Sequence, residues 1–294
     1  MSWILFSILA AFIWAIVNTV DKYVLTKWVK EPIIPVMIMG IVGLIASFII
    51  FLVQGFPYLS PINIALAFIA GIFYILANSF YFRAAKLEEI SRVAPLFNLA
   101  PIFVLILAAI FLGEIFSPIK YLGIFSLVMG AILISSKNYL KFSFKKPFWL
   151  MMASVISFAI TLVITKYLLN SADYWTIFAY IRLGTIGALI PIFYFHFGKL
   201  ASIVKEHGKK IVGLISINET LNIFGILLFT IAAASGYITL VESLASAESF
   251  FLLLITIIIS IFYPKVLRED IKKSTVLLKF IALILIFIGV VLIS

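Results

Sequence analysis

The chain has 294 residues, of which 65% are hydrophobic and only 12% are charged, with a formal net charge of +10. A water-soluble globule of this length needs many more charged surface residues, so the composition predicts an integral membrane protein. The sequence contains no cysteine, which excludes disulfide bonds, thiol nucleophiles and thiolate metal sites.

Apolar runs of about 20 residues, the length of helix that crosses about 30 Å of hydrocarbon, follow one another along the chain. They span residues 3–20, 33–53, 62–82, 93–112, 118–136, 148–165, 174–197, 211–235, 238–262 and 275–293. The segments between them are rich in Pro, Gly, Ser and Lys and leave no room for a soluble domain. We therefore expect an all-α integral membrane fold with ten transmembrane helices.

The two halves of the chain resemble each other. A shift of 144 residues aligns AIVNTVDKYVL (15–25) with AITLVITKYLL (159–169), and the same shift pairs Gly40 with Gly184. Glycine and lysine matches are harder to obtain by chance than leucine matches, so we interpret the similarity as an internal repeat. Because the first apolar run takes part in it, we expect this run to belong to the fold and not to a cleaved leader.

Five helices in each repeat is an odd number, so the second repeat must enter the membrane from the opposite side. We therefore expect two inverted five-helix repeats, the first over residues 1–136 and the second over residues 148–294. Residues 137–147, which read KNYLKFSFKKP, form a cytoplasmic linker in this interpretation.

The basic residues follow this inversion. Most of the 22 Lys and Arg residues lie in loops after the odd-numbered runs, whereas Lys120 and Lys166 lie on the opposite side. By the positive-inside rule the basic side is cytoplasmic, which predicts a multi-pass protein of the cell membrane with both termini outside. The net charge then reflects orientation in the lipid bilayer, and we expect no nucleic-acid partner.

The stretch APIFVLILAAIFLGEIFSPIKYLGIFSLVMGAILI (100–134) combines a proline, an LGE triplet that ends a helix, and two spaced glycines. These features are carried by Pro101, Glu114, Gly123 and Gly130. The stretch resembles the fourth and fifth helices of the drug/metabolite transporter superfamily, EamA type. The resemblance implies a ten-helix transporter but names no solute.

The resemblance also implies an arginine in the second helix of a repeat, and Arg182 stands at that place in the second half. The first half departs from the pattern, because the repeat partner of Arg182 is Ile38. The second half has no LGE triplet and carries IFYPKVLRED (261–270) around its counterpart.

Arg182 lies inside the apolar stretch AYIRLGTIGALI (179–190). An arginine at a helix centre costs roughly 2.5–3.5 kcal/mol on insertion scales, so it must face water or an acid. Two hypotheses remain open. Arg182 either pairs with Glu219 or Glu242 to hold helices together, or it lines a central cavity and binds an anionic group of the solute.

The run INETLNIF (217–224) places Asn218, Glu219 and Asn222 on one flank of a helix. Such a stripe does not face lipid. It either hydrogen-bonds to other helices or binds the solute, with Glu219 as the counter-ion of Arg182 or as a proton carrier.

The run VESLASAESF (241–250) holds Glu242 and Glu248. In a continuous helix six residues separate them by about 240°, so at most one lines the cavity. We favour Glu242, which shares its flank with Ser246 and Ser249.

Three amides of the first half, Asn18, Asn78 and Asn98, are the remaining candidates for the cavity, although each could instead be a helix-to-helix hydrogen bond. Two charged residues receive structural interpretations. Lys166 is expected to extend to the membrane interface, and Glu114 to cap the tight turn that follows its own helix.

We interpret the protein as a secondary transporter that moves a small polar metabolite by alternating access, with possible proton or sodium coupling. The solute is expected to be an amino acid or a small organic anion or zwitterion, and the resemblance suggests export. A flippase for a lipid-linked solute is the alternative.

A membrane-embedded enzyme is a less favoured third hypothesis. The adjacent acids Glu88 and Glu89, and Glu269 and Asp270, lie in separate loops interleaved with Lys and Arg. The two histidines, His196 and His207, are not clustered, so we expect no metal, no cofactor and no catalytic residue.

Overall fold

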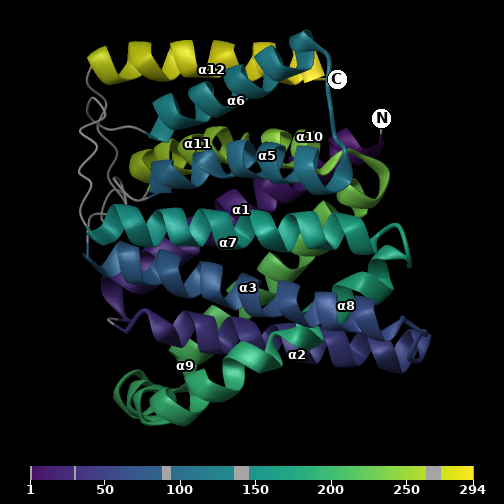
Figure 1. Ribbon diagram of the computed structural model, residues 1–294. Coiled ribbons are helices and arrows are strands. Elements are labelled where there is room, and N and C mark those ends of the chain that lie inside the picture. Colours follow the sequence, from purple (N-terminus) through teal and green to yellow (C-terminus); the bar gives the residue numbers. More distant parts are fainter. Residues whose placement is uncertain (1, 30, 88–93, 136–145, 263–272, 294) are drawn as a thin grey trace.

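The computed structural model describes residues 2–29, 31–87, 94–135, 146–262 and 273–293, and Figure 1 shows that these form a bundle of helices. The helices are α1 Ser2–Lys27, α2 Ile33–Gln54, α3 Pro61–Leu87, η1 Ala94–Leu99 (a 3₁₀ helix), α5 Ala100–Leu112, α6 Pro118–Ser135, α7 Lys146–Leu168, α8 Tyr174–Gly184, α9 Ile186–Ser235, α10 Ile238–Ala245, α11 Glu248–Phe262 and α12 Lys273–Ile293. The described part contains no strand, which confirms the all-α prediction.

Each of the ten apolar runs falls on helix, but the runs and the helices do not correspond one to one. The run 174–197 is divided between α8 and α9, and the run 238–262 between α10 and α11. Helix α9 contains parts of two runs, which are separated at Gly208, where φ is 72°. A positive φ is natural for glycine, so the chain can reverse there.

Seven helical segments of the described residues are long and apolar enough to cross a membrane. They are Trp3–Leu25, Ile33–Gln54, Pro61–Leu87, Lys146–Leu168, Tyr174–Glu206, Lys210–Ser235 and Ile238–Ile259. Three shorter apolar helices, Leu96–Leu112, Pro118–Leu133 and Ile284–Ile293, fall on the other predicted runs. The chain is thus a multi-pass membrane protein.

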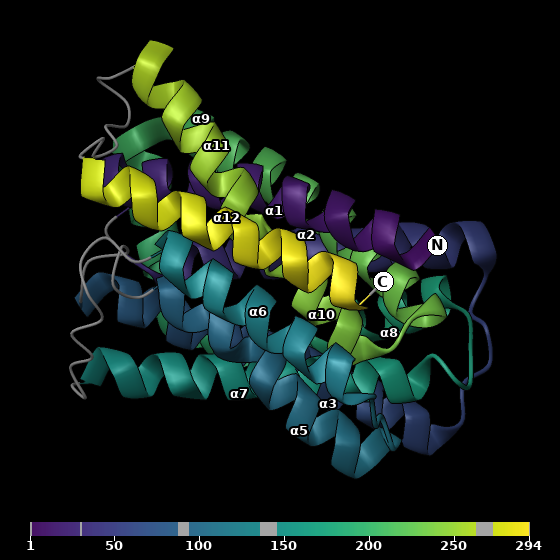
Figure 2. The same ribbon diagram turned by 90° about the horizontal axis from the view of Figure 1, so that it is seen from above.

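Close contact between helices depends on glycine at two places. A Cβ atom at Gly71 of α3 or at Gly184 of α8 would overlap the backbone of the other helix. Helices α6 and α12 approach in the same way at Gly123 and Gly289, and Figure 2 shows them side by side along one side of the bundle. Each contact joins a helix from the first half of the chain to one from the second.

Glu114 is structural, as predicted, but its partner is not the turn beside it. Its buried carboxylate accepts hydrogen bonds from the backbone N–H groups of Ile238 and Thr239 at 2.9 and 3.1 Å, and from the Thr239 hydroxyl at 2.8 Å. Glu114 therefore caps the first turn of α10, in the other half of the chain. A local interpretation of the LGE triplet could not reveal this partner.

Lys166 has a specific partner that its sequence did not reveal. Its ammonium group donates to the carbonyl oxygens of Ala233 and Gly236, both at 2.7 Å. These carbonyls end α9, where the helix dipole favours a cation. Glu114 and Lys166 thus stabilise the two ends of the connection between α9 and α10.

We predict that Glu114→Ala lowers the free energy of unfolding by about 2 kcal/mol or more, because three buried donors lose their acceptor. The thermal midpoint of the purified protein in detergent should fall by roughly 4–8 °C. The exposed acid Glu206 offers a control, since Glu206→Ala should change the midpoint by little. Equal midpoints for Glu114→Ala and the wild type would contradict the capping role.

Candidate functional site

Arg182 lies in the last turn of α8 and is only 4% exposed. Its guanidinium group lies over the ring of Tyr74 of α3, with 3.9 Å between Cζ and the ring centroid, and 5.6 Å from the ring of Phe178. These contacts are cation–π interactions, which stabilise a desolvated cation by about 2 kcal/mol. Aromatic rings, rather than acids, therefore surround the buried charge.

Among the described residues, no carboxylate lies within ion-pair distance of Arg182. The hypothesis that Arg182 pairs with Glu219 or Glu242 is therefore not realised in this structure. The Nε atom is buried and has no hydrogen-bond partner. A buried guanidinium with an unused donor is suited to an anionic ligand, because a carboxylate or phosphate accepts from such a fork in two places.

Helix α2 borders the arginine at Gly43, where an added Cβ atom would lie 3.4 Å from Cδ of Arg182. A methyl group at this position would reach ordinary van der Waals contact with the arginine side chain. Helix α2 therefore adjoins the arginine site at this glycine.

The stripe on the second part of α9 is buried, as its sequence predicted. Glu219 is 1% exposed and Asn218 is 2% exposed. The Asn222 amide donates to Oε2 of Glu219 at 3.0 Å, whereas Oε1 of Glu219 is buried without a partner. Glu219 and Asn222 also interact electrostatically with the Tyr74 hydroxyl, which places them beside the arginine site.

Asp21 of α1 belongs to the same group of polar residues, although we did not predict it. The Asn218 amide donates to Oδ1 of Asp21 at 2.8 Å and to the backbone oxygen of Val17 at 3.3 Å. A signal was present in the sequence, because Asn18 and Asp21 are three residues apart and share a helix face. The first apolar run ends at residue 20, so Asp21 falls just beyond it.

A second polar group surrounds the junction of α10 and α11. The Asn18 amide donates to Glu248, and the Ser249 hydroxyl donates to Asn98 at 3.2 Å. Glu242 is buried, and its Oε2 atom has no hydrogen-bond partner. The predicted residues Asn18, Asn98 and Glu242 therefore lie near one another, together with Glu248.

The assumption that separated Glu242 from Glu248 is wrong. It took a continuous helix, whereas α10 ends at Ala245 and α11 begins at Glu248. The interruption brings the two carboxyl groups close enough to interact electrostatically. It also breaks the predicted polar stripe, because Ser246 donates to the Glu242 backbone oxygen and Ser249 turns to Asn98.

The two polar groups approach each other around Tyr81 of α3, whose hydroxyl interacts electrostatically with both Asp21 and Glu248. Asn78 lies between Tyr74 and Tyr81 on the same helix. Its amide donates to the Tyr74 backbone oxygen at 2.9 Å, so the structure shows a contact within α3 and none with Arg182. We call these two polar groups together, the one around Arg182 and the one around Glu248, the central polar site.

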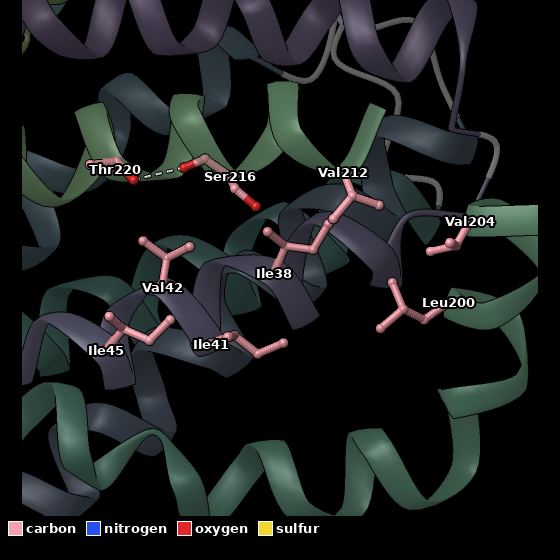
Figure 3. Close-up of a pocket in the computed structure, with 9 residues that line it drawn as sticks. All are labelled: Ile38, Ile41, Val42, Ile45, Leu200, Val204, Val212, Ser216 and Thr220. Carbon is pink, nitrogen blue, oxygen red and sulfur yellow. Dashed lines mark hydrogen bonds between the residues drawn. The ribbon is translucent and has the colours of Figure 1, made fainter. Parts of the chain in front are cut away.

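Figure 3 shows a separate groove of about 370 Å³ between α2 and the two parts of α9. Its wall consists of Ile38, Ile41, Val42, Ile45, Leu200, Val204, Val212, Ser216 and Thr220. The Thr220 hydroxyl donates to the Ser216 backbone oxygen, and the other seven lining residues are aliphatic, so the wall is mainly apolar. None of the predicted site residues lines this groove, which suits an alkyl chain better than a polar solute.

Two predicted features cannot be placed. The acid pairs Glu88 and Glu89, and Glu269 and Asp270, lie outside the described residues, as do most of the linker residues 137–147. Among the described residues, no group of His, Cys, Asp and Glu could hold a metal ion.

The comparisons with known proteins agree with this architecture. Residues 1–136 match the EamA-like transporter family, which confirms the resemblance stated for the sequence. An uncharacterized transporter from the cobO 3' region of a Sinorhizobium species is 42% identical over 55 residues, which are 19% of this chain and 39% of that relative. The matched segment thus spans about two fifths of the relative's length.

A solved structure titled "Crystal structure of protein" superposes with a TM-score of 0.72 and 14% identity. The superposition covers 100% of this chain and 97% of that chain. At this identity the similarity shows that the two chains share a fold, over their whole length.

We predict that Arg182→Met leaves the thermal midpoint unchanged or raises it, since methionine fills a similar volume without a buried charge. Breaking a buried ion pair would instead cost about 3–5 kcal/mol, because the acid would be left uncompensated. The measurement is thermal unfolding in detergent without solute, with the exposed Lys205→Met as control. A large fall in the Arg182→Met midpoint alone would show that Arg182 has a structural partner.

Proposed function

We propose that this chain, whose residues 1–136 match the EamA-like transporter family, is a secondary transporter that moves a small polar metabolite by alternating access. The observation that carries the proposal is the buried guanidinium of Arg182 at the contact between the two halves, which has no described carboxylate at ion-pair distance. The central polar site would then hold the solute, and rocking of the halves would expose it to each side in turn.

The arrangement of the helices supports ten spans in two inverted repeats. Helix α3 packs on α7, and α9 packs on α1 through Gly225 and Trp14. These two helix pairs are equivalent when the halves of the chain are exchanged. The last helices of the halves run antiparallel, since Gly123 lies against Gly289 and Ile293, whereas Gly130 lies against Ala282 and Ile286. Antiparallel last helices are what inverted repeats require.

Orientation follows from the same inversion. The first residue of α1 and the last of α12 lie toward one end of the bundle (Figure 1). The exposed basic residues Lys86, Lys199 and Lys205 follow the odd-numbered runs. We therefore propose that this basic side is cytoplasmic in the cell membrane, with both termini outside.

The chemistry of the site supports an amino acid or another small anion or zwitterion as solute. Arg182 offers a cationic fork, and Glu219 and Glu242 each keep a buried oxygen without a hydrogen-bond partner. One end of a zwitterion could pair with the guanidinium and the other with a carboxylate. We propose export as the direction, on the family resemblance.

A flippase for a lipid-linked solute is the second candidate, and the apolar groove in Figure 3 is the observation that favours it. Val42 and Thr220 of the groove are sequence neighbours of Gly43 and Glu219. Helix α9 therefore presents an apolar face to the groove and a polar face to the central site, and α2 borders both through Val42 and Gly43. An alkyl chain in the groove would lie close to a head group beside Arg182.

We predict that Arg182→Lys folds normally but binds the solute at least about tenfold more weakly, because a point charge replaces a planar fork. Thermal unfolding against amino acids, organic acids, sugars, nucleosides and sugar phosphates would identify the ligand as the one that raises the midpoint. Lys205→Arg is the matched control, since Lys205 is an exposed cation that lines neither the central site nor the groove.

Unchanged affinity in Arg182→Lys would remove the arginine from recognition. Counterflow in proteoliposomes then separates the functions. Saturable exchange of the unmodified solute supports a transporter, dependence on an attached alkyl chain supports a flippase, and chemical change of the solute supports an enzyme.

We further predict that Glu219→Gln keeps solute counterflow but loses accumulation driven by a proton gradient. The reason is geometric, because Glu219 has one buried oxygen without a partner and could carry a proton there. The measurement is solute accumulation in proteoliposomes under an imposed proton or sodium gradient. If the variant still responds to the proton gradient, Glu219 is not the proton carrier.

A further inference from the structure

A small cationic pocket lies where α2, α3 and α9 meet, apart from the central polar site. Its volume is about 190 Å³. The polar residues that line it are Glu31, Ser79, Arg83, Lys86, His196 and Lys199. We call it the vestibule pocket, since three of these residues are exposed at its rim: Arg83, Lys86 and Lys199.

Positive charge exceeds negative charge in this pocket. Glu31 accepts a hydrogen bond from Lys199 at 2.9 Å and lies 3.8 Å from the Lys86 ammonium. The bond from Lys199 holds the pKa of Glu31 below its ordinary value, so this acid stays ionised at neutral pH. No described carboxylate pairs with Arg83. Among the described residues that line the pocket, three cationic side chains thus face one carboxylate.

Ser79 provides an independent indication that the pocket binds a ligand. The residue is 7% exposed, and its hydroxyl has no hydrogen-bond partner. Helical serines and threonines usually donate to the carbonyl four residues earlier, as Thr19 and Thr165 do here. Ser79 leaves that bond unmade and borders the pocket instead. The positive-inside rule explains exposed lysines on one side of the membrane, but it does not explain a buried hydroxyl without a hydrogen-bond partner beside them.

We propose that the vestibule pocket binds a phosphate group. Phosphate has several acceptor oxygens and carries up to two negative charges, which match the excess of two positive charges. The Arg83 fork, the two ammonium groups and the Ser79 hydroxyl supply donors from α3 and α9. The group belongs either to a soluble phosphate compound or to an anionic lipid head group, since both offer the same oxygens.

The vestibule pocket and the arginine site are distinct along α3. Tyr74, which contacts Arg182, is five residues from Ser79 and nine from Arg83. At about 1.5 Å per residue these separations are about 7.5 Å and about 13.5 Å along the helix axis. Phosphate binding can therefore be tested independently of the proposed solute site.

The experiment is calorimetric titration of the purified full chain in detergent with inorganic phosphate at constant ionic strength. We expect saturable binding that Arg83→Gln weakens about tenfold and Ser79→Ala about fivefold, with unchanged thermal midpoints. Lys205→Gln is the matched control for an exposed cation outside the pocket and should stay within about twofold of the wild type.

Absence of saturable binding, or an equal loss in Lys205→Gln and Arg83→Gln, would overturn the proposal. Arg182→Met should keep the phosphate affinity, and a loss there would place the phosphate at the arginine site instead. The two sources of the phosphate group are distinguished by repeating the titration in nanodiscs that either lack or contain phosphatidylglycerol. A share of about 30% of this anionic lipid is sufficient. Competition by this lipid identifies a head group, and its absence identifies a soluble phosphate compound.

Discussion

The arrangement of the site depends on one constraint, which is that a permanent cation stays buried in a membrane-spanning fold with no described carboxylate at ion-pair distance. A guanidinium cannot lose its charge there, so the surrounding helices must provide other stabilisation. The ring of Tyr74 does so from α3, and the same tyrosine contacts the acidic stripe of α9. Tyr74 therefore links the cation to Glu219 while the structure keeps the two charges apart.

Interrupted helices make this arrangement possible. Helix α8 ends two residues after Arg182, where Thr185 donates to the Arg182 backbone oxygen at 2.6 Å. Helix α10 ends three residues after Glu242 and α11 begins at Glu248. In a membrane, backbone polar groups must find partners within the protein. At both interruptions they do so nearby, since the Thr185 N–H donates to the Arg182 carbonyl and the Ser246 N–H to the Glu242 carbonyl.

The sequence indicated which residues are buried and polar, but not how they pair. Arg182, Glu219 and Asn222 could be predicted because a charge or amide inside an apolar run is too costly to face lipid. A continuous helix would separate Glu248 from Glu242, and nothing in VESLASAESF marks the break that the structure shows. Partners from distant segments are set by tertiary packing, which periodicity along one helix does not contain. Glu114 demonstrates this limit, since it caps α10 from the other half.

The glycine contacts suggest where the halves would pivot if they rock. Helices α6 and α12 approach closely at Gly123, Gly130 and Gly289, and Figure 1 shows this pair at the far side of the bundle from α8. Two helices whose backbones are in contact resist sliding past each other, because sliding would bring larger side chains into the contact. On the side of Arg182, α2 and α8 meet through Gly43 and a side chain, which can rearrange. A fixed edge at α6 and α12 with a looser edge at α2 and α8 would open the bundle at the arginine.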